Sequence, residues 1–415
     1  MNAFTIAFLA LLATGTLLQL WLSARQIRHV RAHRGEVPEA FADSIGLAAH
    51  QKAADYTLAR TRLGMVETLY EAVLLLAWTL GGGLDLLDSA WRALGWGELP
   101  TGVAVMLSAF LVMGLLELPF SIWNTFVLEE RFGFNRTRPG TFVADLVKQT
   151  LLMLALGTPL LWVVLWLMQA SGPLWWLWVW LVWMGFTLFM LWAYPAFIAP
   201  LFNRFEPLED EALKQRIEAL LARCGFTSRG VFVMDGSRRS GHGNAYFTGL
   251  GRNKRIVFFD TLLDSLDPDE VEAVLAHELG HFRHHHVTKR LASMALLSLA
   301  GLAALGWLLE QPAFFSGLGV SQPSIYMGLL LFLMVSPLVS VFLQPLMSRL
   351  SRRHEFQADE YAARQTRAAD LIRALVKLYR ENSATLTPDP LYSAFHDSHP
   401  PAPVRIAHLQ NCPAC

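Results

Sequence analysis

Seven long apolar segments limit what this chain of 415 residues can fold into. A helix that crosses the hydrocarbon core of a bilayer needs roughly 20 mostly apolar residues. Segments of this kind occupy residues 4–22, 65–82, 103–122, 150–169, 174–198, 292–309 and 324–343. Only 16% of the residues are charged, whereas an ordinary soluble domain has about 25%. The sequence therefore predicts an all-α polytopic membrane protein with seven transmembrane helices, embedded in the lipid bilayer.

The loops between these segments predict how the chain is oriented. Lys and Arg are concentrated after the first and third segments, at Arg25, Arg28, Arg31, Arg34, Lys52, Arg60, Arg62, Arg131, Arg136, Arg138 and Lys148. Loops 170–173 and 311–323 contain neither residue type. Because basic loops stay on the cytoplasmic side, we expect the N-terminus outside and the C-terminus inside. Over the whole chain, 34 basic residues balance 34 acidic ones, which argues against a nucleic-acid partner.

Two cytoplasmic segments can hold folded structure. The chain divides into transmembrane helices 1–5 with their loops (1–202), a cytoplasmic catalytic segment (203–290), transmembrane helices 6–7 (291–347) and a cytoplasmic tail (348–415). Residues 209–224 predict an amphipathic helix, and residues 230–234 and 255–259 predict short strands. Neither segment is large enough to be stable alone, so we expect them to pack together as one domain.

The clearest chemical signal is a His-Glu-Leu-Gly-His motif that contains His277, Glu278 and His281. Asp267 and Pro268 are typical of a helix start, so the motif is expected on the helix that follows. Two histidines four residues apart lie on one helix face and can bind one zinc ion. The glutamate beside the first can polarise a metal-bound water. The motif therefore predicts a zinc site for hydrolysis.

A catalytic zinc ion normally has three protein ligands, so the third must come from elsewhere in the chain. The tail supplies candidates, because Glu355 and Asp359 are four residues apart and share one face of a predicted helix. One could bind the metal while the other orients a ligand or accepts an arginine. On spacing alone, His354 and Glu360 compete with them as ligands.

Further motifs follow one another in order along the chain. They are Glu-Glu-Arg-Phe-Gly-Phe-Asn at 129–135, Tyr-Pro at 194–195 with Ile-Ala-Pro-Leu-Phe-Asn at 198–203, Ser-Gly-His-Gly-Asn-Ala-Tyr-Phe at 240–247, Glu-Phe-Gln-Ala-Asp at 355–359, and His-Pro-Pro at 399–401 with Arg405. Together with the zinc motif, they resemble the integral-membrane CAAX prenyl protease family. Its members are seven-span zinc metallopeptidases that trim C-terminal tripeptides from prenylated proteins.

The resemblance implies an architecture and a ligand set. Seven helices would wall a large chamber, with a mainly helical, gluzincin-like zinc protease domain that contains a small β element on the cytoplasmic side. It selects Glu355 as the third ligand of one Zn²⁺ per chain, over His354 and Glu360. It also implies that Asp359 pairs with Arg405.

The resemblance assigns the remaining roles as well. His399 would donate to the oxyanion of the tetrahedral intermediate, and Asn244 and Ala245 would bind an extended substrate as an edge strand does. Glu278 would take a proton from the attacking water and later deliver it to the departing amine.

The sequence thus predicts an integral-membrane zinc metalloendopeptidase that acts on peptide or protein substrates, including lipidated or membrane-associated ones. Its task would be CAAX-type C-terminal processing or membrane-protein quality control; the alternative is a non-proteolytic seven-span transporter or a metal-bound scaffold. Short cytoplasmic loops indicate a bacterial inner-membrane protein, or an endoplasmic-reticulum protein if the source is eukaryotic. Cys412 and Cys415 have a CAAX-like spacing, but Pro413 argues against lipidation, and we expect a frayed tail.

Overall fold

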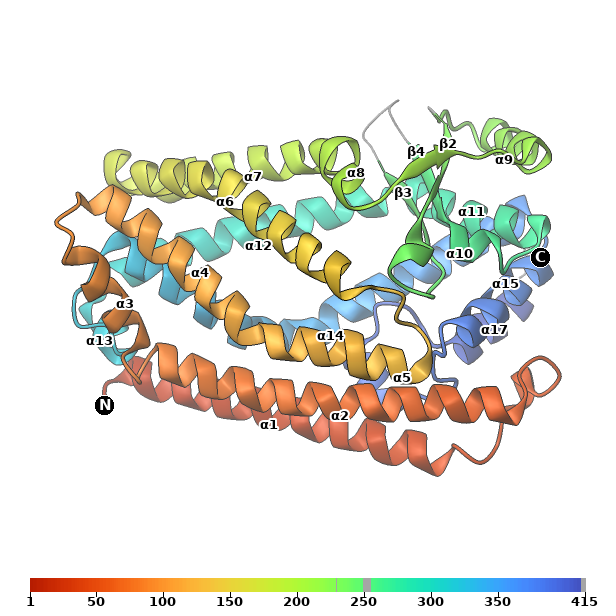
Figure 1. Ribbon diagram of the computed structural model, residues 1–415, viewed down its shortest axis with the longest axis horizontal. Coiled ribbons are helices and arrows are strands. Elements are labelled where there is room, and N and C mark those ends of the chain that lie inside the picture. The colour runs from red at the N-terminus through yellow and green to blue at the C-terminus, as the bar shows by residue number, and fades with distance from the viewer. Residues whose placement is uncertain (229, 249–254, 412–415) are drawn as a thin grey trace.

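Long helices dominate the structure, a computed structural model that describes residues 1–228, 230–248 and 255–411 (Figure 1). The longest are α1 (Ala3–Ala32), α2 (Leu47–Trp78), α4 (Glu98–Trp123), α6 (Pro139–Ala170), α7 (Trp175–Ala193), α12 (His286–Leu309) and α14 (Ile325–Gln365). Shorter helical pieces connect them: η1 (Glu39–Phe41), α3 (Gly83–Arg92), η2 (Asn124–Glu129), α5 (Glu130–Phe132), η3 (Gly172–Leu174), η4 (Tyr194–Ile198), α8 (Ala199–Phe202) and α13 (Pro312–Gly317). The predicted polytopic helical architecture is therefore confirmed.

The number of spans is six or seven. Among the described residues, six helices are long and apolar enough to cross a bilayer. The second predicted segment lies in α2, which passes this test only together with α3, and the two helices meet at an angle of 47°. If this bent pair is one span, the count reaches the predicted seven.

Helix α14 connects the membrane part of the protein to its catalytic end. Its 41 residues extend about 60 Å at 1.5 Å per residue, roughly twice the thickness of a hydrocarbon core. Its first half belongs to the apolar core of the long helices, through Leu330 and Leu331. Its last turns belong to a second core, through Ala362 and Ala363. The last predicted span and the tail helix are thus one continuous helix.

A small sheet lies at the catalytic end (Figure 1). Its strands are β1 (Phe205–Pro207), β2 (Val231–Met234), β3 (Ala245–Thr248) and β4 (Arg255–Phe259), in the order β1-β2-β4-β3. Strands β2 and β4 are parallel, and the outer strands pair antiparallel with them. The sequence predicted the two central strands. No pattern in the sequence predicted β1, and only the family resemblance pointed to an edge strand at Asn244 and Ala245, where β3 begins, because such short edge strands are stabilised by their neighbours rather than by a pattern of their own.

Six helices surround the sheet and the end of α14. They are α9 (Glu211–Arg223), α10 (Asp260–Leu263), α11 (Pro268–Arg283), α15 (Ala368–Glu381), α16 (Pro390–His396) and α17 (Ala402–Gln410). The predicted amphipathic helix is α9, and the Asp210 carboxylate caps it by accepting from the Leu213 amide. Helix α11 begins with a capping box in which Asp267 and Glu270 satisfy each other's backbone amides. Segments 203–290 and 348–415 both contribute residues to the second core.

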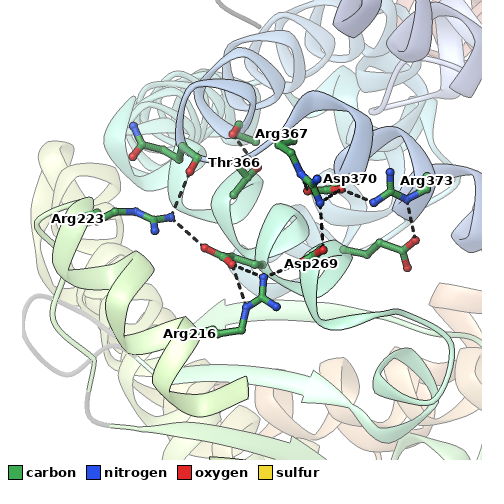
Figure 2. A network of polar contacts seen from close by, with 11 residues as sticks. Arg216, Arg223, Asp269, Thr366, Arg367, Asp370 and Arg373 are labelled. Carbon is green, nitrogen blue, oxygen red and sulfur yellow. Dashed lines mark hydrogen bonds and ion pairs between the residues drawn. The ribbon is translucent and has the colours of Figure 1, made fainter. Parts of the chain in front are cut away.

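A network of ion pairs links α9 and α15 to the first turns of α11 (Figure 2). Arg216 on α9 contacts Asp269 and Glu272 on α11. Arg367, just before α15, contacts Asp269 at 3.1 Å and Asp370 at 2.9 Å. Ion pairs on an exposed surface contribute little to stability, because water screens their charges. The network therefore fixes the orientation of α11 more than it adds stability.

Candidate metal centre and active site

Three candidate ligands converge from two helices. His277 and His281 lie one turn apart on α11, and Glu355 reaches them from α14. The Nε2 atoms of the two histidines are 3.2 Å apart. Oxygen atoms of Glu355 lie 3.4 Å from His277 Nε2 and 3.3 Å from His281 Nε2. The tail segment thus comes next to the His-Glu motif.

This convergence depends on the close approach of the two helices. A Cβ atom added at Gly280, inside the motif, would lie 2.8 Å from the Cα of Ala358 on α14. That separation is well below van der Waals contact, so only glycine fits at this point. The fourth residue of His-Glu-Leu-Gly-His therefore has a packing role, because it brings α14 near enough for Glu355 to reach the histidines.

The ligand set fits a tetrahedral zinc ion. Zinc binds imidazole nitrogen at 2.0–2.1 Å, which places neighbouring tetrahedral ligand atoms about 3.3 Å apart. The two histidine Nε2 atoms are 3.2 Å apart, and each lies at a similar distance from one Glu355 oxygen, His277 at 3.4 Å from Oε2 and His281 at 3.3 Å from Oε1. In addition, Glu355 Oε2 is buried without a hydrogen-bond donor. A buried, unsatisfied carboxylate oxygen is costly, and a metal ion would satisfy it.

A buried chain of polar groups orients His277. Its Nδ1 atom lies 2.9 Å from Asp359 Oδ1. Asp359, which is fully buried, accepts a bidentate interaction from Arg405 on α17, with Nε to Oδ2 at 2.9 Å and Nη2 to Oδ1 at 2.5 Å. Burial opposes protonation of His277, but the hydrogen bonds with Asp359 and Glu355 outweigh it and raise the pKa of His277 to about 9. Asp359 therefore directs Nδ1 away from the metal position and leaves Nε2 facing it.

A different chain orients His281. Its Nδ1 lies 3.0 Å from Nδ1 of His286, whose Nε2 lies 2.9 Å from Oε1 of Gln357. A carboxamide oxygen only accepts, so His286 must donate from Nε2 and, when neutral, accept at Nδ1. His281 then donates from Nδ1, which leaves its Nε2 lone pair free for a metal. His286 thus supports a ligand of the candidate metal site.

His399 lies far from the His-Glu motif in the sequence, but in space it reaches the carboxylate of Glu355. Its Nε2 is 3.4 Å from Glu355 Oε1, and its side chain remains 63% exposed. Partial desolvation lowers the pKa of His399, although Glu355 opposes the shift. His399 is therefore neutral at pH 7 and can donate one hydrogen bond. Glu278, next to His277, is half-buried.

The competing ligands lie elsewhere. His354 stacks on His286, with ring centroids 4.0 Å apart. Glu360 pairs with His408 at 3.3 Å and with Arg364 at 3.8 Å. Neither belongs to the group of ligand atoms within 4.8 Å of one another among the described residues, which consists of His277, His281 and Glu355.

A cavity of about 1060 Å³ joins His399 to the sheet edge. Asn244, on the same cavity, is followed by Ala245, the first residue of the edge strand β3. The Ala245 amide donates to the Asn244 side chain at 2.8 Å. The structure thus brings the zinc motif, Glu355, Asp359, Arg405 and His399 into direct contact. Asn244 lines the same cavity as His399, and Ala245 follows it at the start of β3.

Comparisons with known proteins agree with this geometry. A family model described as "CAAX prenyl protease N-terminal, five membrane helices" matches residues 26–204, and one described as "Peptidase family M48" matches residues 207–412. A CAAX prenyl protease 1 homolog of Caenorhabditis elegans is 33% identical over 434 residues, 97% of each chain. The chain belongs to the CAAX prenyl protease family. The human homolog is 31% identical and covers 94% of this chain and 92% of its own length.

A solved relative supports the same assignment at the level of the fold. The crystal structure of S. mikatae Ste24p has a TM-score of 0.90 and 30% sequence identity, and the match covers 99% of each chain. As a member of this M48 peptidase family, the protein is an integral-membrane zinc metalloendopeptidase. The transporter and scaffold alternatives find no support.

Sequence reasoning missed a polar network on the cavity wall of this protease. Tyr56 Oη donates to Glu129 Oε1 at 2.6 Å, and Glu129 Oε2 lies 3.3 Å from His242 Nε2. Asn382 Oδ1 accepts from the Gly243 amide at 3.1 Å. Glu129 and His242 both occur in the quoted motifs, but they are 113 residues apart. The motifs contain both Glu129 and His242, but only the fold brings the two side chains into contact.

Proposed function

We propose that His277, His281 and Glu355 bind one zinc ion per chain. The observation that carries this proposal is the convergence of the three side chains, whose ligand atoms lie within 4.8 Å of one another, with Glu355 Oε2 left without a hydrogen-bond donor. Two imidazoles and one carboxylate leave a fourth position open, as in hydrolytic zinc sites. An ion held by these three residues would supply Lewis-acid activation of a water molecule and of the scissile carbonyl.

The protein groups around the site complete the reaction. Glu278 accepts a proton from the attacking water and passes it to the leaving amine. His399, held near Glu355 and open to the cavity, donates a hydrogen bond to the developing oxyanion. Asp359 and Arg405 hold His277 in the orientation that hydrolysis requires.

The edge strand provides a platform for the substrate. Strand β3 pairs with β4 on one side only, so its other side can add an extended peptide. Asn244 and Ala245 at its start line or adjoin the cavity and would orient the peptide backbone. Because the relatives are named CAAX prenyl proteases, we assign C-terminal segments of prenylated proteins or peptides as the substrate class.

The orientation in the membrane and the division of the chain are part of this proposal. The distribution of basic loops supports an external N-terminus and a cytoplasmic catalytic domain. That domain combines residues 203–290 and 348–415, whose side chains share one apolar core. The bacterial inner membrane is the assigned location, with the endoplasmic-reticulum membrane for a eukaryotic source.

The test compares the wild type with Glu278→Gln in detergent. Both proteins should bind one equivalent of zinc, because Glu278 is not a ligand, and only the wild type should cut a prenylated reporter peptide. Glu360→Gln on α14 is the matched control and should retain activity, because Glu360 pairs with His408 and Arg364. Failure of either protein to bind zinc would disprove the ligand set. Undiminished cleavage by Glu278→Gln would disprove the proton-transfer role.

A further inference from the structure

The large cavity beside the active site contains a single permanent cation. Of the described residues that line it, Arg60 is the only Arg or Lys. Helix α2 contributes one face to this wall, through Tyr56, Thr57, Arg60, Thr61, Gly64, Glu67 and Thr68. These positions recur at three- and four-residue intervals, as they must on one side of a helix. Arg60 therefore faces the same space as His399 and Asn244.

Arg60 lies within hydrogen-bonding reach of the Tyr56 hydroxyl, and its remaining N–H donors are available for a ligand. No ion pair among the described residues includes it. Glu129, which contacts the wall residues Tyr56 and His242, is occupied on both carboxylate oxygens by these two side chains. A guanidinium group without a carboxylate partner is suited to bidentate recognition of an external carboxylate.

Two acids are found among the described residues that line the cavity, and neither is an ion-pair partner of Arg60. Glu67 lies seven residues after Arg60, about 10 Å farther along the helix axis. Asp397 is the other, and burial raises the pKa of its carboxyl group, so that its charged form is disfavoured. Neither acid forms an ion pair with Arg60, so Arg60 is left without a carboxylate partner on this wall.

The chemistry of a C-terminal substrate matches this cation. A protease that cuts within a long chain meets no free carboxylate near the scissile bond. One that removes a short C-terminal segment always does, and a three-residue segment spans only about 10 Å when extended. The α-carboxylate, with a pKa of about 3.3–3.7, is charged at neutral pH. A cavity of about 1060 Å³ has room for such a segment.

We propose that Arg60 binds the free C-terminal carboxylate of the substrate and thereby makes the enzyme select C-terminal segments over internal peptide bonds. This inference rests on the proposed function. The inference goes beyond the proposed function, because it makes Arg60, a residue of α2 outside the zinc site, responsible for the choice between C-terminal processing and general endoproteolysis.

The test uses two peptides that are identical except for a C-terminal carboxylate or carboxamide. The wild type should cleave the acid with a kcat/KM at least tenfold higher, mainly through a lower KM. Arg60→Gln should lower the value for the acid to that for the amide and leave the amide unchanged. Arg60→Lys, which keeps the charge but not the fork, should restore part of the preference.

The experiment contains its own controls. Cleavage of the amide peptide shows in each variant that the protein is folded and loaded with zinc. Arg62→Gln removes a charge two residues away on a different face of α2, which lines another groove, and should leave the preference for the acid intact.

Three results would overturn the inference. Equal cleavage of both peptides by the wild type would show that the carboxylate is not recognised. An undiminished preference for the acid in Arg60→Gln would show that another group recognises it. If the zinc-loaded wild type cuts neither peptide, the proposed function fails first and the inference falls with it.

Discussion

Replacement of Asp359 by Asn tests the buried chain that orients His277. The change keeps the shape of the side chain and one acceptor, but it removes the negative charge between His277 and Arg405. Asp359 is fully buried and Arg405 nearly so, at 6% exposed. Loss of one partner from a buried ion pair costs about 3–5 kcal/mol of stability. Because Glu355 lies 3.8 Å from Arg405 and offers partial compensation, we expect a value near 3 kcal/mol.

The same substitution should weaken zinc binding. Partners that orient metal-bound histidines typically contribute 10- to 100-fold in affinity, which corresponds to about 1.4–2.8 kcal/mol. Competition with a chelator in detergent measures the zinc affinity, and thermal melting with and without zinc measures the stability. We expect Asp359→Asn to lower both the affinity and the melting temperature.

Glu360→Gln is the control for this prediction. Glu360 follows Asp359 on α14 and undergoes the same chemical change, but its partners are His408 and Arg364. A zinc affinity for Asp359→Asn within threefold of the wild type would refute the orienting role. Equal losses in the two variants would show that the effect is not specific to the contact with His277.

Three further outcomes follow from the site. Because the pKa of His277 is raised to about 9, the metal-free site is protonated at pH 7 and zinc must displace that proton. Chelator competition should therefore show a zinc affinity that rises by up to tenfold per pH unit towards pH 9. A zinc affinity that does not change with pH would contradict this. Gln357→Met removes the acceptor that fixes the tautomer of His286 and should lower zinc affinity about tenfold. Gln357→Glu keeps an acceptor and should leave the zinc affinity unchanged. Equal effects of the two substitutions would show that Gln357 does not orient His281 through His286. His399→Ala should lower kcat by about 10²–10³-fold at unchanged zinc content, and a loss confined to KM would exclude a role in the transition state.

Patterns that repeat within a short stretch of chain were readable from the sequence. Each predicted apolar segment falls mainly within one long helix, because about 20 apolar residues can be accommodated only in lipid or in an extensive core. Helix α11 begins at its predicted cap, since Asp267 and Glu270 lie within one turn of each other. The spacing of His277 and His281 fixes their common face on that helix.

Contacts between distant parts of the chain were not readable in this way. The sequence by itself left Glu355, Asp359, His354 and Glu360 as alternative ligands, and only a family resemblance favoured the first. The packing of α14 on α11 at Gly280 separates them in space.

The sequence by itself determined a membrane protein with a metal-binding His-Glu motif on a capped helix, because hydropathy and helical periodicity act over neighbouring residues. The tertiary structure alone decided which side chains complete the site. Glu355 reaches the histidines from α14, His286 and Gln357 meet across 71 residues, and Arg60 faces the cavity that His399 and Asn244 share. No local pattern encodes these contacts, because each forms only when helices distant in the chain pack against one another.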